Sequence, residues 1–359
     1  MSIKVINQIE DTGWEKLDNT DSPFLSYDFF QSLEESHSIG ASSGWKPVYI
    51  TDPGKSLLYS FIKDHSYGEY IFDWDWARAY DHHGIPYYPK LTSMIPFTSA
   101  TTPHFLGEAK DKVMDHYEEY YQSHAFSSSH FLFLPKNELS FFESYDYTMR
   151  ESFQYHFIND SYGSFSDFLA KLKNRKAKQI KKERLFSADI QFKQFTGVDL
   201  TLAHAKEMYQ FYLTTIDNKQ AIPYLNESFF DKIFVKLRDQ ICYVQATRDE
   251  IPIAGALYFY SSDRLYGRYW GATETVPNLH FELCYYQGID FCIKKGLEVF
   301  EAGAQGEHKI SRGFRPVKTY SAHKLKHESF HEAVKKYVLD EKLNIDRILP
   351  QLNDRLPFK

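Results

Sequence analysis

Acids, bases and glycines gather in one short stretch of the chain, EAGAQGEHKISRGFRP (301–316). Glycines permit positive φ and let a backbone approach a ligand closely. Carboxylates and imidazole can move protons, and cations can stabilise an oxyanion or a phosphate. A structural turn with solvated charges is the alternative, but such a concentration is rare in a mere connection, so we favour function. The candidate catalytic residues are Glu307, His308, Lys309 and Arg312, and the candidate substrate ligands are Glu301 and Gln305.

A carboxylate also lies at the edge of an apolar helical stripe. Glu282 falls three residues after Leu279 and four before Tyr286, inside a helix predicted over 279–295. Half-buried there, it could take a proton from an amine nucleophile. It could equally hydrogen-bond a tyrosine or an arginine as a structural group, and both interpretations stay open. His280, at the start of the same helix, is the second candidate base, against a plain surface position.

A basic helix is the strongest charge feature. The segment LAKLKNRKAKQIKKER (169–184) falls in a helix predicted from Ser166 to about Arg184. Arg175 and Lys176 interrupt its apolar stripe, so we expect them to bind an anionic donor, either a CoA pyrophosphate or a tRNA acceptor stem, rather than to be merely solvated. The outward, solvated face is expected to carry Lys178, Lys181, Lys182 and Arg184.

The segment GEYIFDWDW (68–76) alternates between aromatic and acidic residues, which predicts a strand. Glu69 and Asp73, together with His65, could recognise an amine, although the acids could also be the exposed side of that strand. The four-residue spacing of the three would align them only on a helix, so they are a poor metal set, and we expect no bound metal.

Strands and helices alternate along both halves, which predicts an α/β fold with mixed sheets and a domain boundary near residue 158. The expected domains are 1–158 and 159–359. Tyr266, Arg268 and Trp270 share one face of a strand predicted over 264–272, where they could line a groove or pack on the first half. The other main strands of the second half are predicted over 189–195, 241–249, 253–262 and 299–304, and its helices over 199–216 and 226–239.

The composition excludes several classes of protein. A length of 359 residues favours two domains, and a net charge of −6 excludes a surface that binds nucleic acid everywhere. The three cysteines, Cys242, Cys284 and Cys292, lack metal-site spacing and are expected to be core residues in a reducing compartment. No leader-like or membrane-spanning apolar run is present, so we expect a cytoplasmic protein.

Several motifs resemble those of Fem-type aminoacyltransferases, whose fold is a duplicated GNAT acyltransferase fold. The segment LHFELCYYQGIDFCIKKGLEVFEAGA (279–304) is similar to the Fem pattern of a helix ending in glycine and a strand ending in an acid and glycines. HKISRGFRP (308–316) resembles the Fem "FK-basic-x-FG" turn. Phe314 aligns with it, while Arg315 replaces the second glycine. The substrate-contacting basic residue of that turn corresponds to Lys309 or Arg312.

A still longer resemblance is to the Fem-like "peptidoglycan biosynthesis/recognition" family. It implies two tandem GNAT-like domains and a broad reaction class, but no substrate. The matching blocks are HSYGEYIFDWDWA (65–77), YYPKLTSMIPFTSATTP (87–103), LYGRYWGA (265–272), LHFELCYYQ (279–287), EAGAQGEHK (301–309) and TYSAH (319–323).

The resemblance implies N-acyl or aminoacyl transfer to an amine, with acyl-CoA or aminoacyl-tRNA as donor and a small amine or peptidoglycan-type peptide as acceptor. GNAT enzymes that use acyl-CoA usually carry Arg/Gln-x-x-Gly-x-Gly/Ala before the pyrophosphate-binding helix. Here that junction reads GATETVPNLHFEL (271–283), which tilts the donor towards an aminoacyl group. The alternatives are an acetyl-CoA-dependent N-acetyltransferase with an atypical pyrophosphate loop, and a non-catalytic protein that recognises a peptide or cell-wall fragment.

Overall fold

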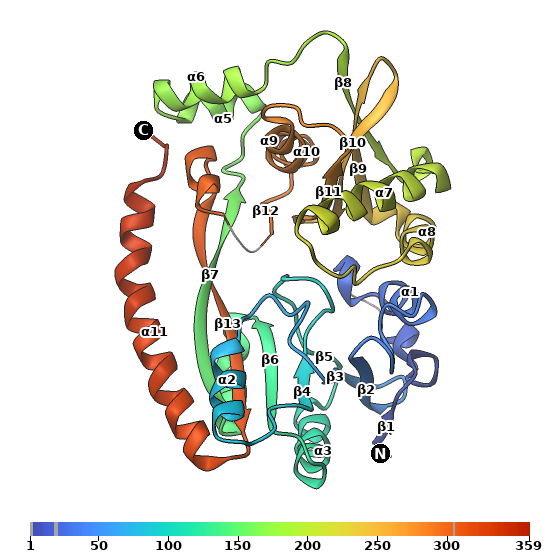
Figure 1. The fold of residues 1–359 in the computed structure, drawn as a ribbon, viewed down its shortest axis with the longest axis vertical. Helices are drawn as coiled ribbons and strands as arrows, with labels where there is room; N and C mark the ends of the chain where they lie inside the picture. The colour runs from blue at the N-terminus through green and yellow to red at the C-terminus, as the bar shows by residue number, and fades with distance from the viewer. Residues whose placement is uncertain (1–2, 18–20, 304–305) are drawn as a thin grey trace. The chain divides into compact units, whose positions relative to one another are not determined.

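A computed structural model describes residues 3–17, 21–303 and 306–359. The chain divides into two compact units (Figure 1). Unit 1 comprises Met1–Thr20, Phe24–Phe153 and Lys318–Ile348, and unit 2 comprises Asp21–Pro23, Gln154–Val317 and Leu349–Lys359.

Unit 1 is built on strands that are hydrogen-bonded in the order β1-β2-β3-β4-β6-β13. Neighbouring strands are antiparallel except for the parallel pair β4–β6. These strands are β1 (Lys4–Ile6), β2 (Trp45–Asp52), β3 (Ser56–Lys63), β4 (Lys90–Ser93), β6 (Ser128–Leu134) and β13 (Arg315–Leu325), and β5 (Phe105–Gly107) pairs with β3. The helices include α1 (Tyr27–Glu35), α2 (Trp74–His82), α3 (Lys110–Ser123), α4 (Leu139–Ser144) and α11 (Glu328–Asp354).

Unit 2 repeats this topology in the order β8-β9-β10-β11-β12-β7, with β11–β12 as its parallel pair. Its strands are β7 (Thr148–Ile158), β8 (Ile190–Thr196), β9 (Ile241–Arg248), β10 (Ile251–Tyr260), β11 (Arg264–Ala272) and β12 (Val299–Glu301). Its helices include α5 (Phe165–Lys171), α6 (Asn174–Glu183), α7 (Leu202–Asn218), α8 (Glu227–Lys236), α9 (Leu279–Phe281), a π-helix (Glu282–Tyr286) and α10 (Gln287–Lys295).

The shared strand order confirms the predicted α/β fold with two tandem mixed-sheet halves. The units differ from the predicted domains 1–158 and 159–359, because two strands run from one unit into the other. Strand β7 begins in unit 1 and pairs with β12 in unit 2, whereas β13 begins in unit 2 and pairs with β6 in unit 1. A single boundary therefore cannot describe the units, and residues 318–348 belong to unit 1.

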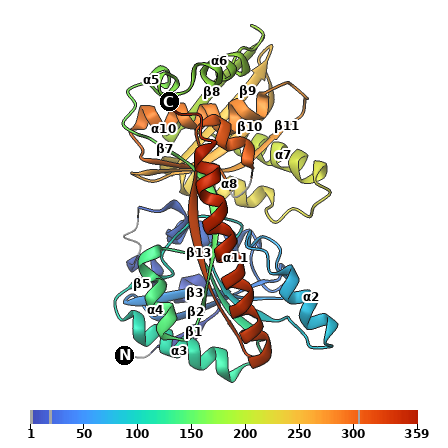
Figure 2. The same ribbon diagram turned by 90° about the vertical axis from the view of Figure 1, so that its left-hand side faces the viewer.

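Helices cover both faces of the unit 2 sheet, with α7 on one side and α9–α10 on the other (Figures 1 and 2). Two glycines allow this close packing. A Cβ at Gly271 would lie 1.6 Å from the carbonyl oxygen of Phe211 on α7, and one at Gly288 on α10 would lie 2.5 Å from the ring of Phe300. Helix α7 is thereby held tightly against β11, and α10 against β12.

The strand predicted over 68–76 is wrong. Gly68 and Tyr70 have φ values of +81° and +57°, which are incompatible with an extended strand, and α2 begins at Trp74. The alternation of aromatic and acidic residues does not separate a buried face from an exposed one in the expected way. Phe72 is exposed, while Glu69 and Asp73 are buried.

The helix predicted from 166 to 184 is divided into α5 and α6, because Leu172 is extended (ψ 153°) and fully buried. The break shifts the phase of α6, so the apolar stripe read from the sequence does not continue through it. Within the described residues, no helix is long and apolar enough to cross a membrane.

Candidate active site

A cavity opens in unit 2 where the parallel strands β11 and β12 stop pairing. Their register runs from Arg264 opposite Val299 to Tyr266 opposite Glu301, and ends there. Beyond it β11 continues, with an irregularity in its pairing to β10 that leaves Arg268 as the extra, bulged residue. Bulges of this kind re-aim side chains next to functional sites.

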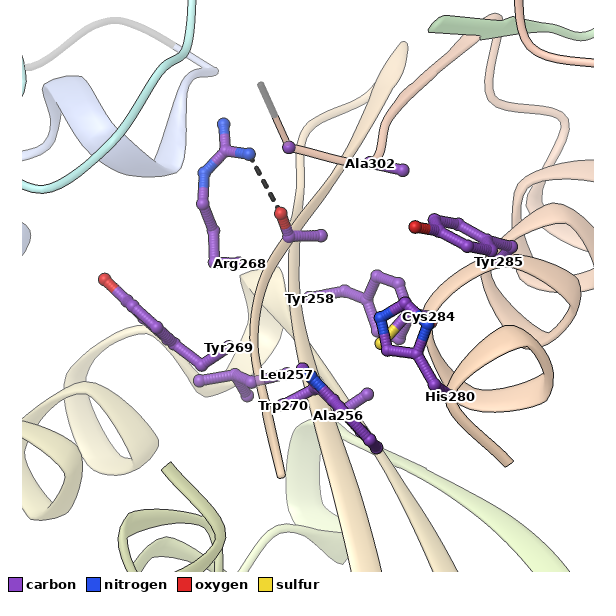
Figure 3. A pocket seen from close by; sticks show the side chains of 12 residues that line it. Ala256, Leu257, Tyr258, Arg268, Tyr269, Trp270, His280, Cys284, Tyr285 and Ala302 are labelled. Carbon is purple, nitrogen blue, oxygen red and sulfur yellow. Dashed lines mark hydrogen bonds between the residues drawn. The ribbon is translucent and has the colours of Figure 1, made fainter. Parts of the chain in front are cut away.

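This β11–β12 cavity has a volume of about 120 Å³. Figure 3 shows Arg268 on its strand side and His280, Cys284 and Tyr285 on its helix side. Arg268 donates a hydrogen bond to the carbonyl oxygen of Gly267 at 3.0 Å. The lining comprises Ala256, Leu257, Tyr258, Gly267, Arg268, Tyr269, Trp270, His280, Cys284, Tyr285, Ala302 and Gly303.

The helix side of the cavity is shaped by the π-helix Glu282–Tyr286. A π-turn widens a helix and leaves carbonyl groups to find other partners, and such turns are frequent at functional sites. Here the carbonyl oxygen of Leu283 accepts a hydrogen bond from the hydroxyl of Tyr258 on β10. Cys284 and Tyr285, the next two residues, both line the cavity.

Lys309 places a buried ammonium group beside the cavity. Its side chain donates a hydrogen bond from Nζ to the carbonyl oxygen of Gly303, a lining residue, at 2.7 Å, and Lys309 is only 1% exposed. Burial lowers the pKa of Lys309 to about 7, and the nearby charge of Arg268 adds to the shift while Cys284 opposes it. A lysine of this pKa can change its charge at physiological pH.

Two histidines lie near the same cavity. The Nε2 atom of His308 is 2.8 Å from the hydroxyl oxygen of Tyr285. Burial, with Arg312 and Lys309 contributing, lowers the pKa of His308. His280 packs edge-on against Trp270, with ring centroids 4.6 Å apart, and burial lowers its pKa to about 4. Both imidazoles are therefore predominantly neutral at pH 7.

Of the residues singled out from the sequence, Arg268, Trp270 and His280 line the cavity, and His308 and Lys309 contact its lining residues Tyr285 and Gly303. The sequence reasoning missed Tyr258 on β10, and it missed Cys284 and Tyr285 because a 3.6-residue periodicity does not reveal a π-turn. Burial raises the pKa of Cys284 far above the range in which a thiolate forms, so this thiol is not a nucleophile.

Glu282 is held in a buried ion pair instead of facing the cavity. Arg184 donates to both carboxylate oxygens, at 3.0 and 2.8 Å, and Gln287 donates to one of them at 2.8 Å. The residue is 2% exposed. With both oxygens engaged, Glu282 suits the structural role that the sequence left open better than the role of a base.

Arg312 belongs to a second buried ion pair. It donates to Glu183 at 2.9 Å and to the Tyr286 hydroxyl at 3.0 Å, and its guanidinium lies 3.5 Å from the ring centroid of Phe281. Its charge is thus already balanced. Between the two basic residues of the turn, Lys309 is the one beside the cavity.

The remaining candidates of unit 2 take other places. Glu301 is buried and pairs with Arg264 at 3.0 Å, whereas Glu307 is exposed and pairs with Arg355 at 3.1 Å. Tyr266 is 3% exposed and lies opposite Glu301 in the β11–β12 register. Gln305 lies outside the described residues.

Arg175 is exposed, and Lys176 is half-buried with its Nζ 3.4 Å from Gln179. The prediction that Arg175 faces inward is therefore wrong, because the break at Leu172 changes the phase of the helix. Lys178, Lys181 and Lys182 are exposed as expected, whereas Arg184 pairs with Glu282. Basic side chains instead spread over the exposed surface of α5 and α6: Lys171, Lys173, Arg175, Lys178, Lys181 and Lys182.

The candidates of unit 1 form a separate buried cluster. Lys90 donates to Glu69 at 2.7 Å and to Asp73 at 2.5 Å, and all three residues are buried. His65 makes a hydrogen-bond contact of 3.1 Å with the carbonyl oxygen of Ser43. In the part of the chain that the structure describes, no group of three or more histidine, cysteine or acidic residues could hold a metal ion.

Several solved structures share this fold. The C-terminal DUF2156 domain of a putative lysylphosphatidylglycerol synthetase from Agrobacterium fabrum has a TM-score of 0.55 and 9% identity, with 92% of this chain and 96% of that chain covered. FemX has a TM-score of 0.54 and 8% identity, with 93% and 100% covered. A conserved protein of unknown function from Bacteroides thetaiotaomicron has a TM-score of 0.53 and 13% identity, with 90% and 100% covered.

At these identities the similarity establishes the fold alone. No curated protein sequence matches the chain. The sequence profile of the FemAB_like family, described as peptidoglycan biosynthesis/recognition, matches residues 5–359. The chain therefore belongs to the FemAB-like family, with a tandem GNAT-like fold.

Proposed function

We propose that unit 2 transfers an aminoacyl group from an activated ester to a primary amine at the β11–β12 cavity. The position of Lys309 carries this proposal: its buried Nζ lies 2.7 Å from the carbonyl oxygen of Gly303 in the cavity wall. A cation held in a low-dielectric site stabilises a developing oxyanion more strongly than it would in water. Lys309 is the group that supplies this stabilisation.

The reaction begins when the acceptor nitrogen attacks the carbonyl carbon of the ester. The C–N bond forms as the electron pair of the C=O bond moves to its oxygen, where Lys309 donates a hydrogen bond. His308, kept neutral by its lowered pKa, takes the proton that the amine loses. The electron pair on the oxyanion then re-forms the C=O bond as the ester C–O bond breaks. Tyr285 passes its hydroxyl proton to the leaving oxygen and takes up the proton that His308 accepted.

The donor that fits best is an aminoacyl-tRNA. The exposed cations of α5 and α6 form a surface suited to the phosphates of a nucleic acid. By contrast, the loop between β11 and α9 contains Glu274 and no lysine or arginine, which disfavours the pyrophosphate of CoA. The acceptor is an amine, and the family description favours one on a peptidoglycan-type peptide. A cytoplasmic location, where aminoacyl-tRNA is available, belongs to the same proposal.

The donor class can be tested directly. Purified protein, a lysine-containing peptide and either radiolabelled aminoacyl-tRNA or acetyl-CoA are incubated, and peptide products are resolved by chromatography. We expect label to pass from aminoacyl-tRNA to the peptide and not from acetyl-CoA. Transfer from acetyl-CoA alone would replace this proposal with an N-acetyltransferase, and no transfer from either donor would contradict it.

The basic surface of α5 and α6 allows a second test. Replacing Arg175, Lys178 and Lys182 together with glutamine should weaken aminoacyl-tRNA binding at low salt. Because up to three phosphate contacts are lost, the slope of log K against log salt should fall by about 2–3. Binding is measured by filter retention between about 50 and 200 mM salt.

The matched control replaces three exposed lysines of unit 1, Lys112, Lys136 and Lys336, with glutamine. This variant changes the net charge by the same amount, so its binding curve should follow the wild type. Equal losses in both variants would mean that only overall charge matters, and that α5 and α6 form no donor surface.

A further inference from the structure

A second cavity of about 680 Å³ adjoins the first in unit 2. It lies between the end of α7, the end of β11 with the loop that follows, and the start of α9. The two cavities share two lining residues, Trp270 and His280. We call it the α7–α9 cavity. Its lining comprises Thr214, Thr215, Asp217, Asn218, Trp270, Ala272, Thr273, Glu274, Thr275, Val276, Asn278, Leu279, His280 and Phe281.

The hydroxyl groups at the wall of this cavity are largely used within the fold. Thr214 donates to the carbonyl oxygen of Phe211 at 2.7 Å, Thr215 to that of Trp270 at 2.6 Å, and Thr273 to that of Ile253 at 3.2 Å. The bond of Thr215 ties α7 to β11, that of Thr273 ties the loop after β11 to β10, and that of Thr214 lies within α7. These bonds leave the carboxylates and amides as the groups that can select a ligand.

One of the two carboxylates is held in an ion pair and the other is not. Glu274 forms an ion pair with Arg248, which also pairs with Asp189 at 3.0 Å. Asp217 is exposed and makes no ion pair within residues 3–17, 21–303 and 306–359. No lysine or arginine lines the cavity in the described part of the chain. The cavity therefore offers at Asp217 a carboxylate that makes no ion pair in the described part of the chain, and the amides of Asn218 and Asn278 belong to the same lining.

We infer that the α7–α9 cavity binds a primary ammonium group, with Asp217 as its counter-charge. An ammonium has three hydrogen-bond donors and no acceptor, which fits a carboxylate and amide oxygens, whereas a phosphate would be repelled. In the proposed reaction this group is the amine of the acceptor, which binds here as an ammonium and loses one proton to solvent before it attacks, as a neutral amine, in the β11–β12 cavity. His280 and Trp270, which line both cavities, then stand on the path from the ammonium site to the acyl carbonyl. The role of acceptor rests on the proposed function; the ammonium site itself does not.

The test measures binding without any donor. The probe is Nα-acetyl-L-lysine amide, and its Nε-acetylated form is the uncharged control ligand. Titrations followed by NMR should show binding of the free amine and little binding of the acetylated form. Asp217→Asn should raise the apparent Kd about two- to fivefold, as expected for the loss of an ion pair with an exposed carboxylate. Glu274→Gln, which alters the already paired carboxylate, should leave the Kd within about 1.5-fold of the wild type.

Equal binding of the two lysine ligands, or an unchanged Kd in Asp217→Asn, would overturn the inference. Glycine methyl ester, a mimic of the aminoacyl end of the donor, identifies the source of the ammonium. If the ester displaces the lysine amide, the site is confirmed but serves the donor's own amino group. Selective lysine binding without transfer from any donor would confirm the site and refute the proposed function. Acyl transfer with a KM for the peptide that Asp217→Asn leaves unchanged would support the proposed function and refute the ammonium site.

Discussion

Replacing Lys309 with methionine is expected to lower kcat for acyl transfer by about 10²- to 10³-fold, the usual cost of losing one oxyanion donor. Methionine fills much of the same volume and brings no charge into a site that is 1% exposed, so the fold should be retained. Because the lysine acts on charge that develops in the transition state, KM for the donor should change little. Steady-state kinetics with aminoacyl-tRNA separate the two constants.

The pH dependence distinguishes the two roles that Lys309 could have. Its pKa in the folded protein is about 7, below the ordinary value of 10.5, so the ammonium predominates only below pH 7. If the cation stabilises the oxyanion, kcat falls as the pH rises through 7. Lys309→Arg, which stays charged at every accessible pH, should lose this fall while retaining part of the activity. A rate that instead rises through pH 7 would make Lys309 the base.

Arg312→Gln is the matched control, since this residue is the other basic candidate of the same turn. Its removal leaves Glu183 buried without its partner, so the loss should appear as reduced thermal stability. The kcat of the folded fraction should stay within about tenfold of the wild type. A severe loss of kcat with unchanged stability would instead place Arg312 at the reaction.

The overall architecture could be predicted because it depends on patterns that single residues cannot disturb. Alternating strands and helices predict the mixed sheets on both sides of residue 158. The pairing of β7 with β12 and of β13 with β6 could not be predicted, since a hydrophobic pattern alone does not say which strand pairs with which neighbour. The alternation of residue types also misled at 68–76, where the buried Lys90 binds Glu69 and Asp73, which lie in the segment that precedes α2.

The candidate site could be predicted in part. The concentration of charge at 301–316 pointed to Lys309 and His308, both of which lie beside the cavity. Sequence spacing could not separate them from Arg312, because the difference lies in Glu183, which is far away in the sequence and close in space. For the same reason Glu282 looked like a base until its partner, Arg184, was located. Which charges are balanced is a property of the tertiary structure.

Lys90 and Lys63, which face each other in the β3–β4 register, should respond oppositely to the same substitution. Lys90→Met is expected to destabilise the protein by about 3–5 kcal/mol, because it leaves Glu69 and Asp73 buried without their counter-charge. Burial alone would lower the pKa of Lys90, but these two carboxylates outweigh it and raise the pKa. Urea unfolding at pH 7 gives the change in free energy.

Lys63 is also fully buried, but its Nζ has no hydrogen-bond partner in the described part of the chain and lies 3.4 Å from the centroid of the Trp45 ring. Burial lowers the pKa of Lys63 to about 6. Between pH 6 and about 10.5 the unfolded chain therefore binds a proton that the folded protein does not, and stability rises with pH across this window. Lys63→Met should increase stability at pH 7 by about 1–4 kcal/mol and remove this part of the pH dependence.

The titration of Glu69 provides a check on the pH dependence that we assign to Lys63. Burial, opposed by Lys90, raises its pKa to about 7, so the folded protein binds the extra proton between pH 4.5 and 7, and stability falls as pH rises there. The contributions of Glu69 and Lys63 to the slope of stability against pH thus have opposite signs. Above pH 7 the contribution of Lys63 is the one that remains. Unfolding curves measured from pH 7.5 to 10 should show a rise in the wild type that is smaller in Lys63→Met. If both lysine variants lose stability, Lys63 is charged and paired in the folded protein, and the opposition between the two lysines does not exist.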